Sequence, residues 1–208
     1  MKRDTRTQIL VASLLLFNEQ GEPQTTTNEI ADGVDISPGN LHYHFRKKGE
    51  IVEALLAEFQ ADARHVLRQP ESGKASLDDF WVFLHGLLEC TAAYRFLFRD
   101  SETLAADHPK VQRALTNFSK GLIAVFELYL RAMAASGVLK IQTDDAAALS
   151  RNLAVLALYS DRFGALFEKA KSADDAALRI AQAIFGALKP YAKGQSDQQL
   201  DELLAHYR

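Results

Sequence analysis

Apolar residues recur at steps of three and four positions through most of the 208-residue chain. This spacing places them on one face of an α-helix, whereas a half-buried strand would need a period of two, which no long run shows. The five prolines, at positions 23, 38, 70, 109 and 190, stand where one periodic stretch ends or the next begins. Proline is tolerated at such helix edges but not in a helix interior. The pattern therefore predicts an all-α fold.

Three short helices are predicted at the N-terminal end, the first of them over residues 5–20. Thr26 and Glu29 have the spacing of a capping box, which starts a second helix. Ser37 and Pro38 suit the cap and the first position of a third helix. Only a tight turn then separates the second and third helices, an arrangement that predicts a helix-turn-helix unit.

Longer helices are predicted in the rest of the chain, over residues 48–69, 77–98, 109–136, 144–168, 173–188 and 197–207. We expect two domains, residues 1–47 and residues 48–208, linked by the helix over 48–69. The helices over 144–168 and 173–188 carry heptad-like apolar stripes flanked by alanines. Such stripes permit close helix packing across a subunit interface, although packing within one subunit would give the same pattern.

The third short helix carries the residue types that contact DNA. Leu41 and Phe45, four positions apart, can anchor one face in a three-helix core. Asn40, Tyr43 and His44 then face outward, beside small residues at the start of the helix. Small and hydrogen-bonding groups on a helix of this kind can read base edges and contact phosphates in the major groove.

The formal net charge of −3 neither indicates nor excludes a nucleic-acid partner, because the placement of the charges matters more. Basic residues form one cluster at positions 2, 3 and 6 and a second at 46–48, with no Lys or Arg in between. The two clusters flank the predicted helix-turn-helix. The lack of basic residues between them also supports an alternative, a helical protein-interaction module with weak or lost DNA binding.

Catalytic and metal-binding signatures are not found in the sequence. There is no glycine-rich phosphate loop, no Gly-x-Ser-x-Gly elbow and no His-Glu-x-x-His motif. Cys90 is the single cysteine, and His42 and His44 are two positions apart, so they point away from each other on a helix. We expect no enzyme activity, no metal and no cofactor. The apolar run over residues 14–17 is far shorter than the roughly 20 residues that cross a bilayer, so we expect a cytoplasmic protein without a membrane partner.

Three segments together resemble the tetracycline-repressor (TetR) family of bacterial regulators. They are Thr-Thr-Asn-Glu-Ile-Ala over residues 26–31, Ile-Ser-Pro-Gly-Asn-Leu-His-Tyr-His-Phe over 36–45, and Lys-Gly-Glu-Ile over 48–51. The resemblance covers about the first 55 residues, with the family's spacing held without a gap. This chain departs from the usual family residues at Asp35, where the family usually has Gly in the turn, and at His42, where it usually has Tyr.

The resemblance implies a role for each matching residue on double-stranded operator DNA. Thr27, Asn28, Tyr43 and His44 would touch phosphates and sugars, and Lys48 would hold a phosphate at the start of the linking helix. Pro38, Gly39 and Asn40 would meet base edges or thymine methyl groups. The DNA-binding residues expected from the sequence are Thr27, Asn28, Ser37, Pro38, Gly39, Asn40, His42, Tyr43, His44 and Lys48.

For residues 48–208 the resemblance implies a domain that forms a homodimer and encloses a small-molecule effector. Aromatic side chains at helical spacing suggest an apolar or aromatic ligand, although such a stripe is more often simply core. We expect the pocket to be lined by Phe80, Trp81, Leu84, Tyr94, Phe118, Phe126, Tyr129, Tyr159 and Phe163. The sequence analysis thus predicts a DNA-binding transcriptional regulator, a repressor that a ligand releases from its operator.

Overall fold

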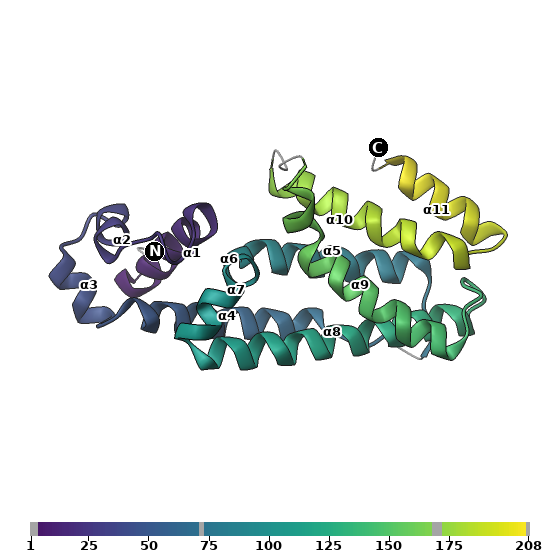
Figure 1. Cartoon of the computed structure of the whole chain (residues 1–208), viewed down its shortest axis with the longest axis horizontal. Coiled ribbons are helices and arrows are strands. Elements are labelled where there is room, and N and C mark those ends of the chain that lie inside the picture. Colours follow the sequence, from purple (N-terminus) through teal and green to yellow (C-terminus); the bar gives the residue numbers. More distant parts are fainter. Residues whose placement is uncertain (1–3, 71–72, 168–171, 207–208) are drawn as a thin grey trace. The chain divides into compact units, whose positions relative to one another are not determined.

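The computed structural model describes residues 4–70, 73–167 and 172–206, which fold into helices joined by short connections (Figure 1). Within these ranges there is no β-strand, only an isolated antiparallel bridge between Leu139 and Ala192. The all-α prediction is confirmed. None of the helices in these ranges is long and apolar enough to span a membrane. In chain order they are α1 (Thr5–Gln20), α2 (Thr27–Gly33), α3 (Pro38–His44), α4 (Lys48–Val66), α5 (Leu77–Ala93), α6 (Arg95–Arg99), α7 (Ser101–Asp107), α8 (Pro109–Ala135), α9 (Thr143–Gly164), α10 (Ala173–Leu188), the 3-10 turn η2 (Lys189–Tyr191) and α11 (Gln195–His206).

The helix expected over residues 77–98 is divided into α5 and α6, because the side chain of Asn18 interrupts its hydrogen bonds. The Asn18 amide donates to the carbonyl oxygen of Ala93 at 2.7 Å and accepts from the backbone N–H of Phe96 at 3.0 Å. Tyr94, between them, leaves the helical conformation with φ −117° and ψ 36°. A polar group inserted into the ladder of a helix is a known cause of such breaks, but periodicity does not reveal it.

The chain forms two compact units, each built from two segments. The first unit comprises residues up to 62 together with 93–116, and the second comprises 63–92 and the residues from 117 onward. The helices α4 and α8 therefore each supply residues to both units, and the last residue of α5, Ala93, belongs to the first. The boundary expected after residue 47 separates a DNA-reading segment from the rest, and it stays a prediction about function.

In the first unit, the short N-terminal helices bury one apolar side chain after another against a common core. Phe17, Ile30 and Leu41, one from each of α1 to α3, have no exposed surface. The ring of Phe17 lies 5.3 Å from that of Phe96 in α6, centroid to centroid. Burial of this kind contributes about 1.5–3 kcal/mol for each large side chain, so the three-helix unit depends on α6 as well as on its own members.

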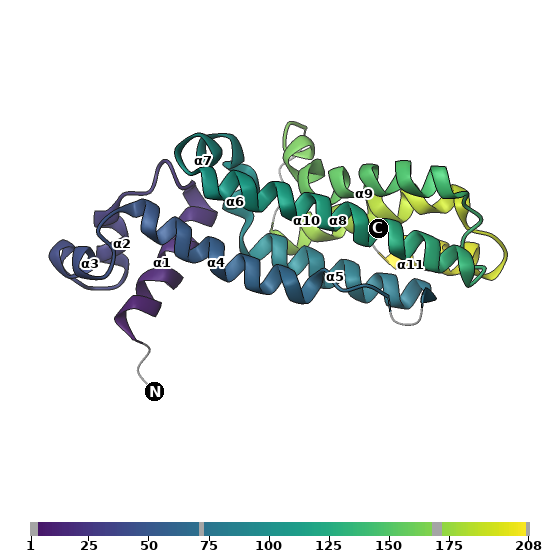
Figure 2. The ribbon, with the colours of Figure 1, turned by 90° about the horizontal axis from the view of Figure 1, so that it is seen from below.

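In the second unit, the core is a cluster of aromatic rings around Phe80 of α5. Its ring centroid lies 5.8–6.1 Å from those of Phe83, Phe126, Tyr129 and Phe185. These residues come from α5, α8 and α10. In the same unit, α9 and α10 pack side by side in both views of the ribbon (Figures 1 and 2).

Candidate nucleic-acid interface and effector cavity

The second helix begins with a complete capping box. The Thr26 hydroxyl accepts from the backbone N–H of Glu29 at 3.2 Å, and the Glu29 carboxylate accepts from the backbone N–H of Thr26 at 2.7 Å and from its hydroxyl at 2.8 Å. The backbone N–H of Thr26 and then its hydroxyl lower the pKa of Glu29. The Glu29 carboxylate is therefore engaged by hydrogen bonds at the N-terminal end of its own helix.

The turn between α2 and α3 forms with Asp35 in the position where the family usually has Gly. Asp35 adopts φ 57°, the left-handed region, which Asp tolerates better than most residues. The backbone N–H groups of Asp35 and Ile36 donate to the carbonyls of Asp32 and Ala31, each at 3.1 Å. The turn therefore forms despite the departure from Gly.

The third helix is amphipathic in the direction predicted from its sequence. Its start is capped by the Ser37 hydroxyl, which accepts from the backbone N–H of Asn40 at 3.2 Å, with Pro38 as the first residue. Leu41 is buried, and Phe45 directly after the helix is 2% exposed. The remaining side of α3 faces solvent. The exposed residues are Ser37, Pro38, Gly39, Asn40, His42 and Tyr43, and His44 is half-buried.

Tyr43 has the most prominent side chain of this face, with 85% of its surface exposed. Its ring meets that of His44 edge to face at 5.3 Å between centroids. On α2, Asn28 is exposed and Thr27 is half-buried. An exposed aromatic residue among hydrogen-bonding groups contributes nothing to the core, so it is available to a partner.

The basic clusters flanking this face differ in how their members are placed. Arg46 and Lys47, directly after α3, are exposed. Arg6 lies over the ring of Phe45, with 4.9 Å between the guanidinium carbon and the ring centroid. The other two members of the N-terminal cluster, at positions 2 and 3, lie outside the described residues.

Lys48, for which a role in holding a DNA phosphate stays a prediction, contacts the loop between α1 and α2. Its ammonium lies 3.1 Å from the Glu22 carboxylate and donates to the carbonyl oxygens of Glu22 at 2.8 Å and Thr25 at 3.0 Å. The Glu22 side chain is only 7% exposed and that of Lys48 27%. A buried carboxylate needs such a partner, and no pattern in the sequence indicates that Glu22 is buried.

A second group of polar contacts fixes the C-terminal end of α1 against α6. The Arg99 guanidinium donates to the carbonyl oxygens of Phe17 at 2.6 Å and Asn18 at 3.0 Å. Arg95 also donates to the Asn18 carbonyl at 2.8 Å. The Asp100 carboxylate accepts from Arg99 and from the backbone N–H of Glu22. These contacts satisfy helix-end carbonyls that have no partner within α1, and no sequence motif marks them.

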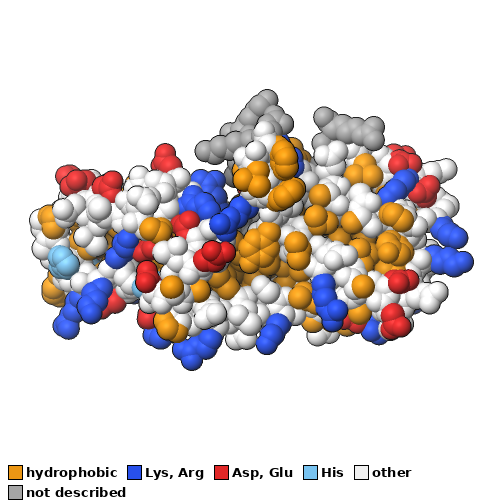
Figure 3. Space-filling model, in the orientation of Figure 1, with side chains coloured by type: hydrophobic (Ala, Val, Ile, Leu, Met, Phe, Trp, Pro, Cys, Tyr) orange, Lys and Arg blue, Asp and Glu red, His pale blue; other side chains and the backbone are white. Residues whose placement is uncertain are grey.

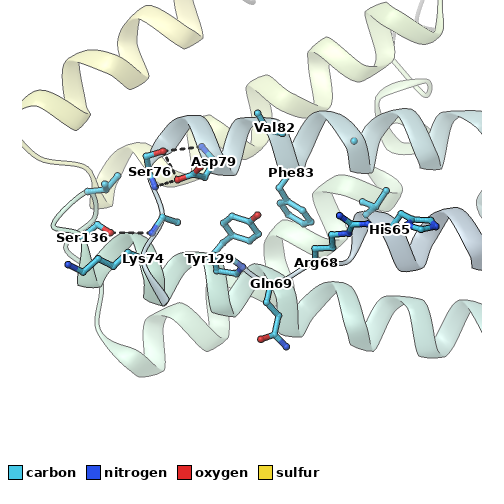
Figure 4. Close-up of a pocket in the computed structure, with 15 residues that line it drawn as sticks. His65, Arg68, Gln69, Lys74, Ser76, Asp79, Val82, Phe83, Tyr129 and Ser136 are labelled. Carbon is cyan, nitrogen blue, oxygen red and sulfur yellow. Dashed lines mark hydrogen bonds between the residues drawn. The ribbon is translucent and has the colours of Figure 1, made fainter. Parts of the chain in front are cut away.

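The second unit contains a cavity of about 820 Å³ between the C-terminal end of α4, the first half of α5 and the C-terminal end of α8 (Figure 4). Phe83 and Tyr129 form its apolar wall as a stacked pair, with ring centroids 4.7 Å apart and an angle of 18° between the planes. Polar side chains surround the stack. The lining residues are His65, Val66, Arg68, Gln69, Pro70, Lys74, Ala75, Ser76, Asp79, Val82, Phe83, Gly86, Tyr129, Ser136 and Val138.

Of the nine residues expected to line a ligand pocket, Tyr129 lines this cavity. Most of the polar residues around the cavity were not foreseen, because Arg68, Gln69, Lys74 and Ser76 lie in the connection between α4 and α5, where periodicity carries no information. The other eight divide by exposure. Phe80, Leu84, Tyr94, Phe118 and Phe126 are buried, whereas Trp81, Tyr159 and Phe163 are exposed at 37%, 41% and 65%.

Exposed apolar side chains gather on α9 and α10 (Figure 3). Val155, Tyr159 and Phe163 follow one another at four-residue steps along α9 and are each at least 41% exposed. Leu178 of α10 is 43% exposed. Tyr159 and Phe163 thus belong to a surface, and their spacing alone could not separate this from a pocket wall.

No group of three His, Cys, Asp or Glu side chains that could hold a metal ion occurs in the described ranges. Cys90 is buried. The described residues thus offer chemistry for polar and apolar contacts at two places: the exposed side of α3, and the cavity beside Tyr129.

Comparison with known proteins matches both parts of the chain to one family. Residues 9–55 match the model of bacterial regulatory proteins of the tetR family, and residues 58–200 match a model described as bacterial transcriptional repressor, TetR. YttP of Bacillus subtilis, a probable HTH-type transcriptional regulator, is 36% identical over 59 residues, which are 28% of each chain. TtgR of Pseudomonas putida, an HTH-type transcriptional regulator, is 34% identical over 70 residues, 34% of this chain and 33% of TtgR. These matches span about a third or less of the two relatives.

Solved structures extend the likeness over the whole chain. A TetR-family transcriptional regulator from Marinobacter aquaeolei VT8 is 28% identical, with a TM-score of 0.88 over 99% of this chain and 100% of that one. CprB from S. coelicolor A3(2), a TetR family protein, shares the fold at 17% identity, with a TM-score of 0.70 over 98% of this chain and 96% of that chain. The chain belongs to the TetR family of bacterial transcriptional regulators.

Proposed function

We propose that the protein is a homodimeric repressor that binds double-stranded operator DNA through α3 and leaves it when a small molecule occupies the cavity beside Tyr129. The observation that carries the DNA part is the division of α3 into two sides. Leu41 is fully buried, while Asn40, His42 and Tyr43 are exposed beside the small residues that start the helix. This division leaves a hydrogen-bonding surface that the fold does not use.

On DNA, Pro38, Gly39 and Asn40 would face the bases of the major groove, with Asn40 as the hydrogen-bonding reader. Thr27, Asn28, Tyr43 and His44 would contact the backbone, with Arg46 and Lys47 adding positive charge next to them. Ser37 and His42 border the same face. We assign Lys48 a different part from that implied by the family resemblance: it orders the α1–α2 loop through Glu22 and Thr25.

The apolar face of α9 and α10 supports the homodimer. Val155, Tyr159 and Phe163 expose large side chains on one side of a long helix, and solvent-exposed apolar patches of this kind mark interaction surfaces. Dimeric helix-turn-helix proteins place their two recognition helices on successive major grooves, about 34–36 Å apart, so a homodimer is the form that an inverted-repeat operator requires. Sedimentation of the protein and of the Phe163→Asp variant tests the face: a native dimer that becomes a monomer supports it, and an unchanged state contradicts it.

Selection of bound sequences from a random duplex-DNA pool tests the function as a whole. We expect an inverted repeat, bound by a dimer with an affinity that falls steeply as salt rises. If the folded protein enriches no sequence, the repressor proposal is wrong and the helical protein-interaction module takes its place.

A further inference from the structure

We propose that the cavity of the second unit takes an organic anion, a carboxylate on an aromatic or aliphatic body, with Arg68 as its main counter-ion. This inference rests on the proposed function, in which the cavity holds an effector, and it names the chemical class of that effector. Four observations within the second unit carry it.

The first observation is the shape and apolarity of the central wall. Phe83 and Tyr129 are 6% and 8% exposed and stack with nearly parallel rings. Val66, Val82 and Val138 extend this apolar lining. A flat body, aromatic or aliphatic, buries its surface against such a wall at about 25 cal/mol for each Å² removed from water.

The second observation is a pair of exposed cations among the described lining residues. Arg68 and Lys74 line the cavity from opposite ends of the stacked pair and are both exposed (Figure 4). One N–H group of Arg68 contacts Nδ1 of His65 at 3.2 Å, which leaves the other donors of the guanidinium available. Lys74 has no ion pair or side-chain hydrogen bond with any residue that the structure describes. A guanidinium can bind a carboxylate through two parallel hydrogen bonds, which favours Arg68 as the counter-ion.

The third observation is that the carboxylate lining this cavity is already used by the fold. Asp79 accepts from the backbone N–H of Ser76 at 2.8 Å and from its hydroxyl at 2.7 Å, which caps the start of α5. These two bonds, the backbone one first, lower the pKa of Asp79. Asp79 thus stays charged and engaged with the cap. Two permanent cations remain against one carboxylate among the described lining residues, which disfavours a cationic ligand.

The fourth observation is a hydrogen-bond donor in the middle of the cavity. The Tyr129 hydroxyl has no partner among the described residues, and every fully buried polar side-chain atom in those ranges does have one, so this hydroxyl opens on the cavity. Burial, and then the charge of Asp79, raises the pKa of Tyr129. The hydroxyl therefore keeps its proton at neutral pH and offers it to an acceptor on the ligand. Ser136 is not available in this way, because its hydroxyl already donates to the Ala132 carbonyl at 3.0 Å.

Calorimetric titration of the full-length protein with matched probes tests the proposal. One set is 4-phenylbutyrate, 4-phenylbutanamide and 4-phenylbutylamine, and the second is decanoate, decanamide and decylamine, so that each set varies the charge on a constant body. We expect at least one carboxylate to bind at least about tenfold more tightly than its amide, the size of effect that one charge-assisted hydrogen bond gives, and its amine to bind most weakly. If neither carboxylate binds more tightly than its amide, the proposal is wrong.

Three variants locate the charge. Arg68→Gln should abolish the preference for the carboxylate, Lys74→Gln should reduce it about two- to fivefold, and Lys120→Gln, an exposed site on α8 outside the cavity, should leave it unchanged. A preference that survives both Arg68→Gln and Lys74→Gln contradicts the assignment, with circular dichroism showing that the variants are folded. DNA selection with the same protein separates the two proposals. If an inverted repeat is enriched but no carboxylate is preferred over its amide, the proposal of an anionic effector is wrong and the proposal of a DNA-binding repressor stands.

Discussion

The end of α1 and the start of α6 are joined by directed polar contacts, whereas the centre of the second unit is filled by aromatic rings. In the first unit, Asn18, Arg95 and Arg99 satisfy particular carbonyl and N–H groups at 2.6–3.0 Å. In the second, Phe80 and its neighbours meet at 5.8–6.1 Å between ring centroids, with varied angles. Hydrogen bonds fix one geometry, while apolar rings tolerate several packings of similar volume. The first arrangement suits a part that must hold a helix in one position, and the second would suit the effector binding proposed for this unit.

The largest effect is expected from removing a ring at the centre of the second unit. Phe80→Ala should lower the free energy of unfolding by about 3–5 kcal/mol, because the cavity it leaves is bordered by other rings that cannot all move in. Urea denaturation measures this change. Tyr43→Ala, at the 85% exposed aromatic residue of α3, is the control and should change stability by less than about 0.5 kcal/mol. Similar losses in both variants would show that burial is not what distinguishes them.

A smaller effect is expected from breaking a polar contact in the first unit. Lys48→Met should lower the free energy of unfolding by about 1–3 kcal/mol, because it leaves the nearly buried Glu22 carboxylate without its cation. DNA binding should weaken, but the slope of log affinity against log salt should stay the same. Lys47→Met is the matched control at an exposed neighbour: stability should hold, and the slope should fall by about one phosphate contact. A reduced slope in Lys48→Met would show that Lys48 contacts a DNA phosphate.

A substitution on the exposed side of α3 should disturb neither the polar contacts of the first unit nor the aromatic core of the second. Asn40→Ala should cost about 1–3 kcal/mol of discrimination at one base pair of the operator, because a hydrogen-bonding reader is lost. Its free energy of unfolding should change little, since the Asn40 side chain is exposed. Repeating the DNA selection with the variant measures the change. Uniform weakening on all sequences would place Asn40 on the DNA backbone.

Substitutions of Asp35, in the turn between α2 and α3, should change the free energy of unfolding by about 1 kcal/mol or less. Asp35 has φ 57°, so Asp35→Gly removes a steric cost of the left-handed region, partly offset by the greater freedom of Gly in the unfolded chain. We expect a small gain in stability from Asp35→Gly and a loss of about 1 kcal/mol from Asp35→Ala. Thermal unfolding of the two variants should give shifts of opposite sign, and shifts of equal sign would rule out strain as the cause.

The smallest effect concerns the two helix-start carboxylates, one in each unit. The pKa of Glu29 is lowered from its ordinary 4.5 and that of Asp79 from 3.8. A carboxyl whose pKa is lower in the folded state stabilises the fold above its unfolded value, and this contribution is lost as the pH falls through the folded value. The difference in unfolding free energy between the protein and Glu29→Gln should therefore be constant down to about pH 4.5 and shrink below it.

For Asp79→Asn the same difference should persist further, to about pH 3.8, before it shrinks. Acid titrations of the two variants against the unchanged protein give both curves. Curves that shrink in the opposite order would mean that neighbouring charges, and not the two caps, control these groups.

The sequence predicted those features that depend on neighbouring residues along the chain. The all-α class, the Thr26–Glu29 capping box and the Ser37 cap follow from local patterns, and the structure confirms each of them. The outward side of α3 was predicted for the same reason, because Leu41 and Phe45 fix which face is buried.

Features that depend on distant segments were not predicted. The break at Tyr94 requires the Asn18 side chain, which is 75 positions from the carbonyl it binds. Glu22, the partner of Lys48, lies 26 positions away, and no sequence pattern indicates that it is buried. The lining of the cavity comes from three helix ends, and a spacing rule along a single helix does not bring these together. Periodicity therefore located the core but did not distinguish buried Phe80 from exposed Phe163.

The contacts of Arg99 and Asn18 bear on the design of chimaeric regulators, in which the DNA-binding segment of one protein is joined to the effector-binding part of another. A transplant cut after residue 47 would remove the arginine donors from the carbonyl of Asn18 and would expose the ring of Phe17, because α6 covers both; the Phe17 carbonyl would keep only its bond from the Gly21 backbone N–H. The segment over residues 93–116 would have to be transferred together with the N-terminal helices, since it belongs to the same compact unit. The exchangeable module of this protein is thus discontinuous in sequence, and a working graft needs three junctions, within α4, at the end of α5 and within α8, rather than one in a loop.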